Sequence, residues 1–266
     1  MTRRFSYIAI ALAFIATLTS CREYEVTLRE RMRPGITIAN TSLSIIDETC
    51  LLTTFVLHFN SVLETEGDIE RYEMYERYFD NYKLERADDN TYELCSLIYG
   101  NGSKEGFRIT TDGKTLGEGG SWQITTFDES LQYSISGTAE GYNVEIAKCI
   151  VQTDLFTTAT LSFKEYNVAV AATETESKDV LSLGIVGQIT ASESDALTLD
   201  IELCDEVHFV SNMGYIAGTV DIECNNIRYG HTDKVIVTLH EGDLHDIEYN
   251  GEYAMIPNHN VYYRGE

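Results

Sequence analysis

The sequence has little proline and few basic residues. Two prolines, Pro34 and Pro257, occur in 266 residues, so no proline-rich linker marks a boundary between domains. The 19 basic residues are outnumbered by 43 acidic ones, which gives a net charge of −24. Because nucleic-acid binding depends on Lys and Arg neutralising phosphates, this balance argues against nucleic acid as a partner. It equally disfavours direct docking on anionic lipid headgroups.

Short catalytic motifs are also missing. The chain has no G-x-S-x-G, no H-E-x-x-H and no C-x-x-C. The glycine-rich segment at residues 100–106 leads into a strand-like run and has the wrong glycine spacing for a dinucleotide loop, so it predicts a hairpin turn. No cofactor is predicted, and the sequence leans against an enzyme.

Cysteine is scarce and odd in number once Cys21 is set aside. Five cysteines remain at long spacings, so no disulfide framework can be recognised. Cys204 and Cys224 both lie near the ends of strand-like runs. They either form a disulfide, as an exported protein allows, or remain small buried thiols.

The first 20 residues carry the clearest targeting signal of the chain. Arg3 and Arg4 precede an apolar run of residues 5–16, which is shorter than the roughly 20 residues that span a bilayer core. A basic flank before a short apolar run is typical of a secretory signal. Removing residues 1–20 takes away two bases and no acid, so the mature chain would carry −26.

Leu18-Thr19-Ser20-Cys21 resembles the lipobox of bacterial lipoproteins: an aliphatic residue, two small residues and a cysteine. The resemblance implies lipidation of the Cys21 thiol, cleavage before Cys21 and acylation of the new amino terminus. Several acyl chains hold a protein on a membrane more firmly than one, since each buried methylene contributes about 0.8 kcal/mol. The alternative is an ordinary cleaved signal with a cysteine nearby.

Arg22 follows Cys21, where enteric lipoproteins retained in the inner membrane carry an aspartate. The chain therefore looks more like an outer-membrane lipoprotein, on either the periplasmic or the cell-surface face. In general layout it resembles the many uncharacterised outer-membrane lipoproteins of Gram-negative bacteria.

Residues 21–41 are charged, contain Pro34-Gly35 and lack regular periodicity, so they are interpreted as a tether. Residues 42–86 predict a helical hairpin. Apolar residues recur at three and four positions over 52–63, and an aromatic stripe follows Asp68 as far as about Lys83. That stripe is interpreted as a packing seam, with glycan stacking as the alternative.

Residues 87–266 predict an antiparallel β-rich domain. Here the hydrophobic period changes to two, and strand-like runs recur every 10 to 14 residues without helices between them. The expected fold is therefore mainly β (α+β): an N-terminal helical pair followed by a long antiparallel meander with one wetted face. The expected strands cover residues 91–99, 107–110, 122–125, 131–136, 142–146, 166–171, 181–190, 197–203, 215–224 and 235–239.

The function expected from these features is a membrane-anchored lipoprotein that serves as a non-enzymatic binding, adhesive or envelope-structural module. Its partners would be the membrane, through Cys21, and an extracellular or periplasmic protein or glycan. One alternative is a glycan-acting hydrolase, although 43 acids leave no carboxylate pair to nominate. Another is a metal-binding lipoprotein using His240 and His245, a spacing that matches no established metal motif.

Overall fold

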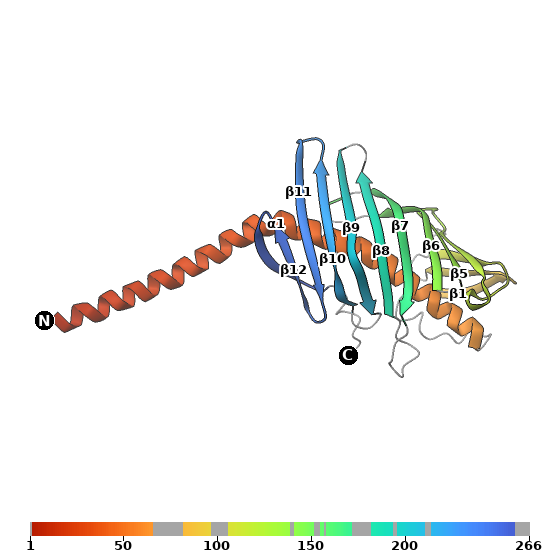
Figure 1. Ribbon diagram of the computed structural model, residues 1–266, viewed down its shortest axis with the longest axis horizontal. Helices are drawn as coiled ribbons and strands as arrows, with labels where there is room; N and C mark the ends of the chain where they lie inside the picture. The colour runs from red at the N-terminus through yellow and green to blue at the C-terminus, as the bar shows by residue number, and fades with distance from the viewer. Residues whose placement is uncertain are drawn as a thin grey trace.

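The computed structural model contains one long helix followed by a single large sheet (Figure 1). The structure describes residues 2–65, 82–96, 106–138, 141–151, 155–156, 158–171, 182–193, 196–210 and 214–258. Helix α1 spans Thr2–Thr65. The strands are β1 Tyr82–Asp88, β2 Thr91–Ser96, β3 Gly106–Thr111, β4 Ser121–Thr126, β5 Leu131–Thr138, β6 Gly141–Val151, β7 Ala159–Ala171, β8 Ser182–Glu193, β9 Leu197–Val210, β10 Gly214–Asn226, β11 His231–His240, β12 Leu244–Tyr249 and β13 Glu252–Pro257.

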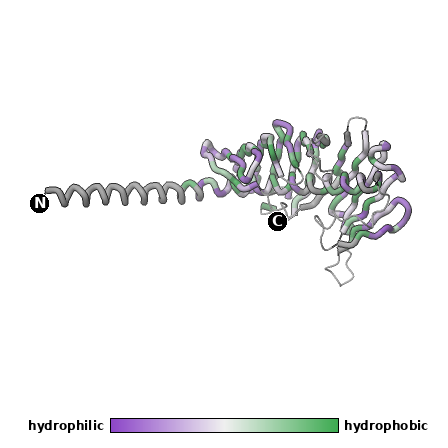
Figure 2. The backbone as a smooth tube through the Cα atoms, turned by 90° about the horizontal axis from the view of Figure 1, so that it is seen from below, coloured by the Kyte–Doolittle hydropathy of each residue, from purple (hydrophilic) through white to green (hydrophobic). Residues whose placement is uncertain are grey.

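The 13 strands lie in the sheet in the order in which they occur in the sequence, and each is antiparallel to its neighbours. This confirms the expectation of a mainly β protein built on a long antiparallel meander. Hydrophobic and hydrophilic residues alternate along the strands, as the hydropathy colouring of Figure 2 shows. Such alternation lets one face of the sheet be buried while the other meets solvent.

The buried face, called the inner face below, packs on the C-terminal half of α1. Phe59 of α1 lies against Tyr92 of β2 and Trp122 of β4, with ring centroids 5.2 and 5.9 Å apart and the rings steeply inclined. Edge-to-face aromatic pairs of this kind add to the free energy gained from burial. The opposite face, called the outer face, carries the polar residues of the alternating pattern.

Three buried tyrosines of the sheet form hydrogen bonds with α1. The Tyr166 hydroxyl lies 2.7 Å from the Thr49 hydroxyl, and the Tyr133 hydroxyl lies 3.0 Å from that of Thr53. Tyr215 donates to the backbone carbonyl of Leu43 over 3.4 Å. Because buried polar groups need partners, these hydrogen bonds set the position of the helix along the sheet.

The middle strands are bent where their pairing register shifts. β7 has a bulge between Lys164 and Asn167 opposite β8, and β8 shifts between Ile185 and Gly187 opposite β9. Gly187 has φ +121°, and a Cβ there would lie 2.6 Å from the carbonyl oxygen of Glu165. Bulges bend and twist the strands that carry them. They accompany the bend of the sheet around α1 (Figure 1).

The segment 21–41, expected as a tether without regular structure, is helical and belongs to α1. Its second half lies in the core, since Met32, Ile38 and Ala39 are at most 3% exposed. The presence of Pro34-Gly35 led to the incorrect prediction of a tether at residues 21–41. Gly35 lies where any Cβ would meet the Tyr249 ring at 2.5 Å, so this glycine serves close packing of helix and sheet.

The second helix of the expected pair falls mostly on residues 66–81, which lie outside the described residues. Its last predicted turn, at Tyr82 and Lys83, instead begins β1 and pairs with β2. The β-rich region thus starts at residue 82, a few residues earlier than expected.

By length and composition, the stretch Glu30–Ser61 of α1 could cross a membrane. Within its most apolar window, however, 88% is buried inside the protein. This burial indicates the role of a core helix, enclosed by the inner face of the sheet.

Candidate functional site

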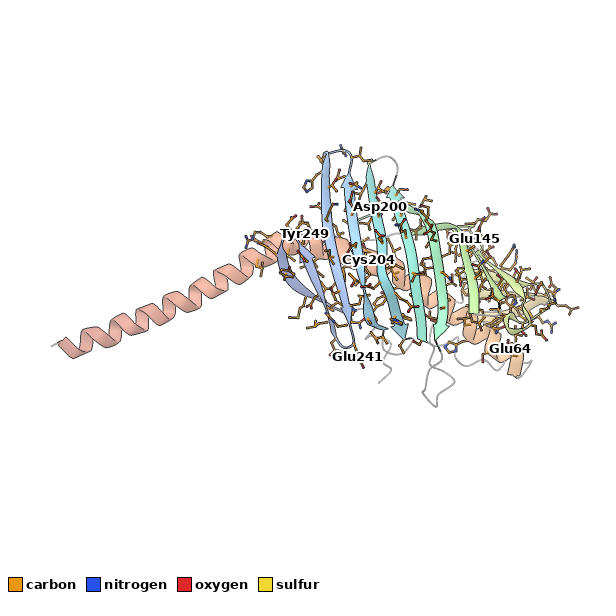
Figure 3. All side chains as sticks on the ribbon, in the orientation of Figure 1. Glu64, Glu145, Asp200, Cys204, Glu241 and Tyr249 are labelled. Atoms are coloured by element: carbon orange, nitrogen blue, oxygen red, sulfur yellow. The ribbon has the colours of Figure 1, made fainter. Side chains whose placement is uncertain are left out.

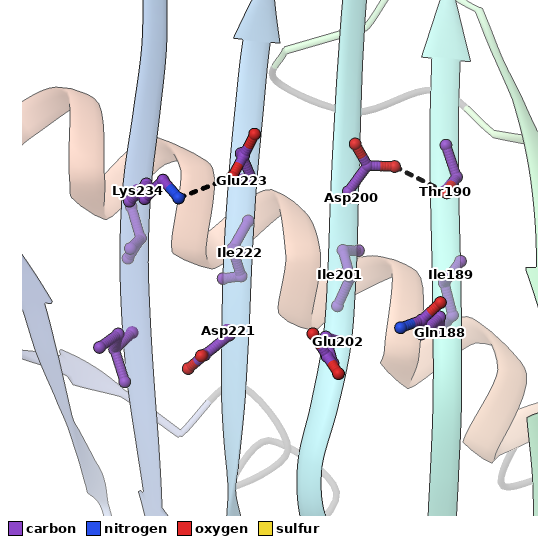
Figure 4. A pocket seen from close by; sticks show the side chains of 12 residues that line it. Gln188, Ile189, Thr190, Asp200, Ile201, Glu202, Asp221, Ile222, Glu223 and Lys234 are labelled. Atoms are coloured by element: carbon purple, nitrogen blue, oxygen red, sulfur yellow. Dashed lines mark hydrogen bonds and ion pairs between the residues drawn. The ribbon is translucent and has the colours of Figure 1, made fainter.

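The outer face of β8–β11 carries a shallow groove of about 460 Å³ (Figures 3 and 4). Strand alternation produces it: residues whose neighbours along the chain are buried turn their own side chains outward. Asp200 and Glu202, for example, flank the buried Ile201 on β9. Behind these strands lies α1, so the groove and the helix occupy opposite sides of the sheet (Figure 4).

Two cross-strand rows line the groove. The register places Thr190, Asp200, Glu223 and Lys234 in one row and Gln188, Glu202, Asp221 and Ile236 in the next. Residues directly opposite on adjacent antiparallel strands have Cβ atoms about 5 Å apart. Four carboxylates and one ammonium group therefore share one small surface.

The first row is tied together by polar contacts. Lys234 Nζ lies 2.9 Å from Glu223 Oε2, and the Thr190 hydroxyl donates to Asp200 over 2.8 Å. The hydrogen bond from Lys234 holds the pKa of Glu223 below its usual range. In the second row, Glu202 and Asp221 are both exposed and face each other across the strands. The groove therefore presents excess negative charge toward solvent.

Cys204 lies on the outer face beside the acidic rows (Figure 3). Partial burial raises the pKa of its thiol to about 11, and the hydrogen bond to Asp221 with the charge of that carboxylate adds to the shift. A thiol with a raised pKa is a poor nucleophile at neutral pH.

The carboxylates of the second row lie in an open setting, unlike the acid of a typical glycosidase. A glycosidase needs one carboxylic acid with a raised pKa, which burial in an apolar pocket usually provides. Glu202 and Asp221 are exposed, and the groove is open to water. Within the described residues, no group of three or more His, Cys, Asp or Glu side chains is arranged to hold a metal ion.

An exposed apolar corner adjoins the groove on β11–β13. Tyr253 and Met255 of β13 are 67% and 65% exposed, and Leu244 of β12 is 49% exposed. Ile236 connects this corner to the groove: it lines the groove and lies in the cross-strand row that continues through Glu248 to Tyr253. The acidic groove and the apolar corner thus form one continuous surface, called the β8–β13 surface.

His240 and His245 are brought close but face different environments. The buried His245 ring accepts a hydrogen bond at Nδ1 from the backbone of His240 over 3.2 Å and packs edge-on against Tyr215. The exposed His240 ring lies 2.9 Å from Asp246. The two imidazoles therefore take separate partners in this structure.

The remaining sequence candidates concern cysteine. Cys204 and Cys224 are free thiols on opposite faces of the sheet, Cys204 exposed and Cys224 buried. Burial raises the pKa of Cys224 to about 11, with Asp233 contributing. These two cysteines are therefore separate thiols in the structure. Cys21 lies within α1, and its lipidation stays a prediction.

Sequence reasoning did not find the β8–β13 surface. Its carboxylates are a few among 43, and only the pairing register shows that residues from four strands converge. The available signal was the alternation itself, which places Asp200 and Glu202, and likewise Asp221 and Glu223, on one face of their strands.

Comparisons of the chain with protein-family models, with curated proteins and with solved structures found no match. The geometry of the outer face therefore carries the functional argument.

Proposed function

We propose that this chain is a membrane-anchored lipoprotein that binds a basic protein partner through the β8–β13 surface and catalyses no reaction. The surface itself carries this proposal. It joins a groove with four carboxylates and one ammonium group to exposed Tyr, Met and Leu side chains. Charge complementarity steers and orients a partner, while aromatic and Met side chains supply the buried contacts of many interfaces.

The anchor part of the proposal depends on the N-terminal segment. The basic flank, the short apolar run and Leu18-Thr19-Ser20-Cys21 support lipidation at Cys21. Arg22, in place of an aspartate after Cys21, supports an outer-membrane location. Wild-type chain should incorporate a labelled acyl group and fractionate with membranes, and Cys21→Ala should lose both properties. Unchanged labelling and fractionation of Cys21→Ala would show that the proposed lipid anchor is wrong.

The binding part can be tested with a defined probe. A synthetic peptide that alternates Lys or Arg with apolar residues should bind the full chain, and added salt should weaken binding because it screens exposed charges. Glu202→Gln with Asp221→Asn should weaken binding about tenfold, and Tyr253→Ser should act similarly through lost apolar contact.

The matched control is Glu129→Gln with Glu241→Gln, which removes the same two charges from exposed turns outside the groove. This control should leave most of the affinity intact. Equal effects of the two double variants would show that only net charge matters, and the proposed binding surface would then be wrong.

A further inference from the structure

The pairing ladder between β6 and β7 is interrupted over a stretch called the opening below. Tyr142 pairs with Val168, and the next pair along the two strands joins Cys149 to Leu161. Within these described strands, residues 143–148 and 162–167 form no ladder pair across the opening, although each stretch remains strand. Backbone polar groups that would normally be paired in the ladder are thus left to other partners.

A bulge on the far side of β7 accompanies the opening. Glu165, a non-glycine residue, has φ +53°, and it lies within the register shift of β7 against β8. Gly187 of β8 approaches it so closely that a Cβ on Gly187 would lie 2.6 Å from the Glu165 carbonyl oxygen. β7 is therefore held tightly against β8 where it parts from β6. Backbone strain and bulges are frequent at binding sites.

A groove of about 470 Å³ lies at the end of the opening. Asn143 of β6 and Asn167 of β7 are the first residues beyond the Tyr142–Val168 pair, so the register places them opposite each other. Both are exposed, and within the described part of the chain neither side chain makes a hydrogen bond. The described residues that line it are Ser136, Thr138, Tyr142, Asn143, Asn167, Val168 and Ala169.

None of the described lining residues is charged, although the chain has 43 acids and 19 bases. A cationic ligand would find no carboxylate among these described residues, and the net charge of −24 repels an anionic one. Tyr142, Val168 and Ala169 supply the apolar part of the described lining. Its polar part consists of amide and hydroxyl groups, which both donate and accept hydrogen bonds.

We propose that the groove between β6 and β7 binds a neutral saccharide, with Asn143 and Asn167 contacting its hydroxyl groups. An amide presents a donor and an acceptor side by side, which matches two adjacent sugar hydroxyls. Tyr142 and the Ser136 hydroxyl border the same space. This site lies apart from the β8–β13 surface and does not rest on the proposed anchor or on the basic partner.

The experiment titrates the full chain, in a detergent without a sugar headgroup, with neutral hexose and N-acetylhexosamine oligosaccharides. Acidic oligosaccharides and a neutral polar peptide are tested in parallel. At least one neutral oligosaccharide should bind, and Asn143→Ala and Asn167→Ala should each weaken it at least about tenfold by removing hydrogen bonds to its hydroxyls. Asn143→Asp and Asn167→Asp, which keep the side-chain size but remove the N–H donors, should weaken binding comparably.

Two controls separate this site from the proposed function. Asn225→Ala removes an outer-face amide on β10 that is not part of the lining, and Glu202→Gln alters the acidic groove. Both should leave saccharide affinity unchanged. Absence of binding by every neutral oligosaccharide would overturn the proposal. So would preference for the acidic oligosaccharides or the peptide, or equal binding by folded Asn143→Asp and Asn167→Asp variants.

Discussion

At the scale of single residues, the hydrogen bonds between buried tyrosines and α1 specify how the helix sits on the sheet. The Tyr166–Thr49 contact, at 2.7 Å, joins residues 117 positions apart in the sequence. Both groups are buried, so an unpaired hydroxyl would lose its solvation without compensation. No sequence pattern could pair these two residues, because each looks ordinary in its own segment.

Tyr166→Phe should lower the free energy of unfolding by about 1 kcal/mol, the usual net contribution of a buried hydrogen bond. Thr49→Val should cost at least as much, because it also removes the hydrogen bond from the Thr49 hydroxyl to the Ile46 carbonyl. The double variant should cost less than the sum, because both changes remove the Tyr166–Thr49 hydrogen bond. Denaturant titration measures all three. Tyr229→Phe, at a 75% exposed position, is the control and should change stability little. Full additivity of the two core substitutions would contradict the contact.

The Cys204 thiol is a second residue whose chemistry depends on a neighbour. Partial burial and Asp221 raise its pKa to about 11. The thiolate is the reactive form, so alkylation by iodoacetamide should stay slow at neutral pH and accelerate only toward pH 11. Asp221→Asn should move the profile to lower pH, because the amide no longer repels the thiolate. Peptide mapping follows Cys204 separately, and a wild-type profile centred near the ordinary thiol pKa would contradict this assignment.

At the scale of elements, the strands were largely predictable, and the helix was predictable only from residue 42 onward. Alternation of polar and apolar residues identifies the strands in the sequence, and the run expected at 197–203 appears within β9, Leu197–Val210. Helix α1 is buried on several sides and contains Pro34, Gly35 and many β-branched residues, so propensity and periodicity did not predict it before residue 42. Packing inside the curved sheet, which the sequence does not display, stabilises it.

The bend of the sheet depends on glycine at one crowded position. Gly187→Ala should destabilise the protein by at least about 2 kcal/mol, since the new Cβ would collide with backbone of β7 at a positive φ. Thermal and denaturant unfolding measure the effect. Gly230→Ala is the matched control: φ there is +60° and a Cβ would meet nothing within 4 Å, so its cost should be about 1 kcal/mol. Similar costs at both positions would show that the crowding at Gly187 is unimportant.

At the scale of the whole molecule, composition predicted the class of the chain better than its sites. The alternating pattern indicated a sheet with one face toward solvent, and the structure has one. Neither groove could be located in advance. Each is assembled by register between strands, and in the groove between β6 and β7 the decisive feature is a missing stretch of ladder. Asn143 and Asn167 carry no local signal that they lie opposite each other.

The tyrosines buried between the sheet and α1 determine how the stability of the protein changes at high pH. Tyr133, Tyr166 and Tyr215 are fully buried, and burial raises the pKa of each above its ordinary value near 10. Burial together with Asp233 raises the pKa of Tyr249 to about 12. A phenol whose pKa is raised by folding stabilises the native state fully below its unfolded pKa. That contribution is lost as the pH rises through and beyond this value.

Stability should therefore be insensitive to these tyrosines at neutral pH and fall steeply above about pH 10. The buried tyrosines should ionise only together with loss of the β-sheet signal in circular dichroism. Recording tyrosinate absorbance and circular dichroism on the same samples tests this. Complete ionisation of the tyrosines while the sheet signal persists would mean that water reaches the interface between α1 and the inner face. The enclosed packing that places the binding surfaces on the outer face would then be incorrect.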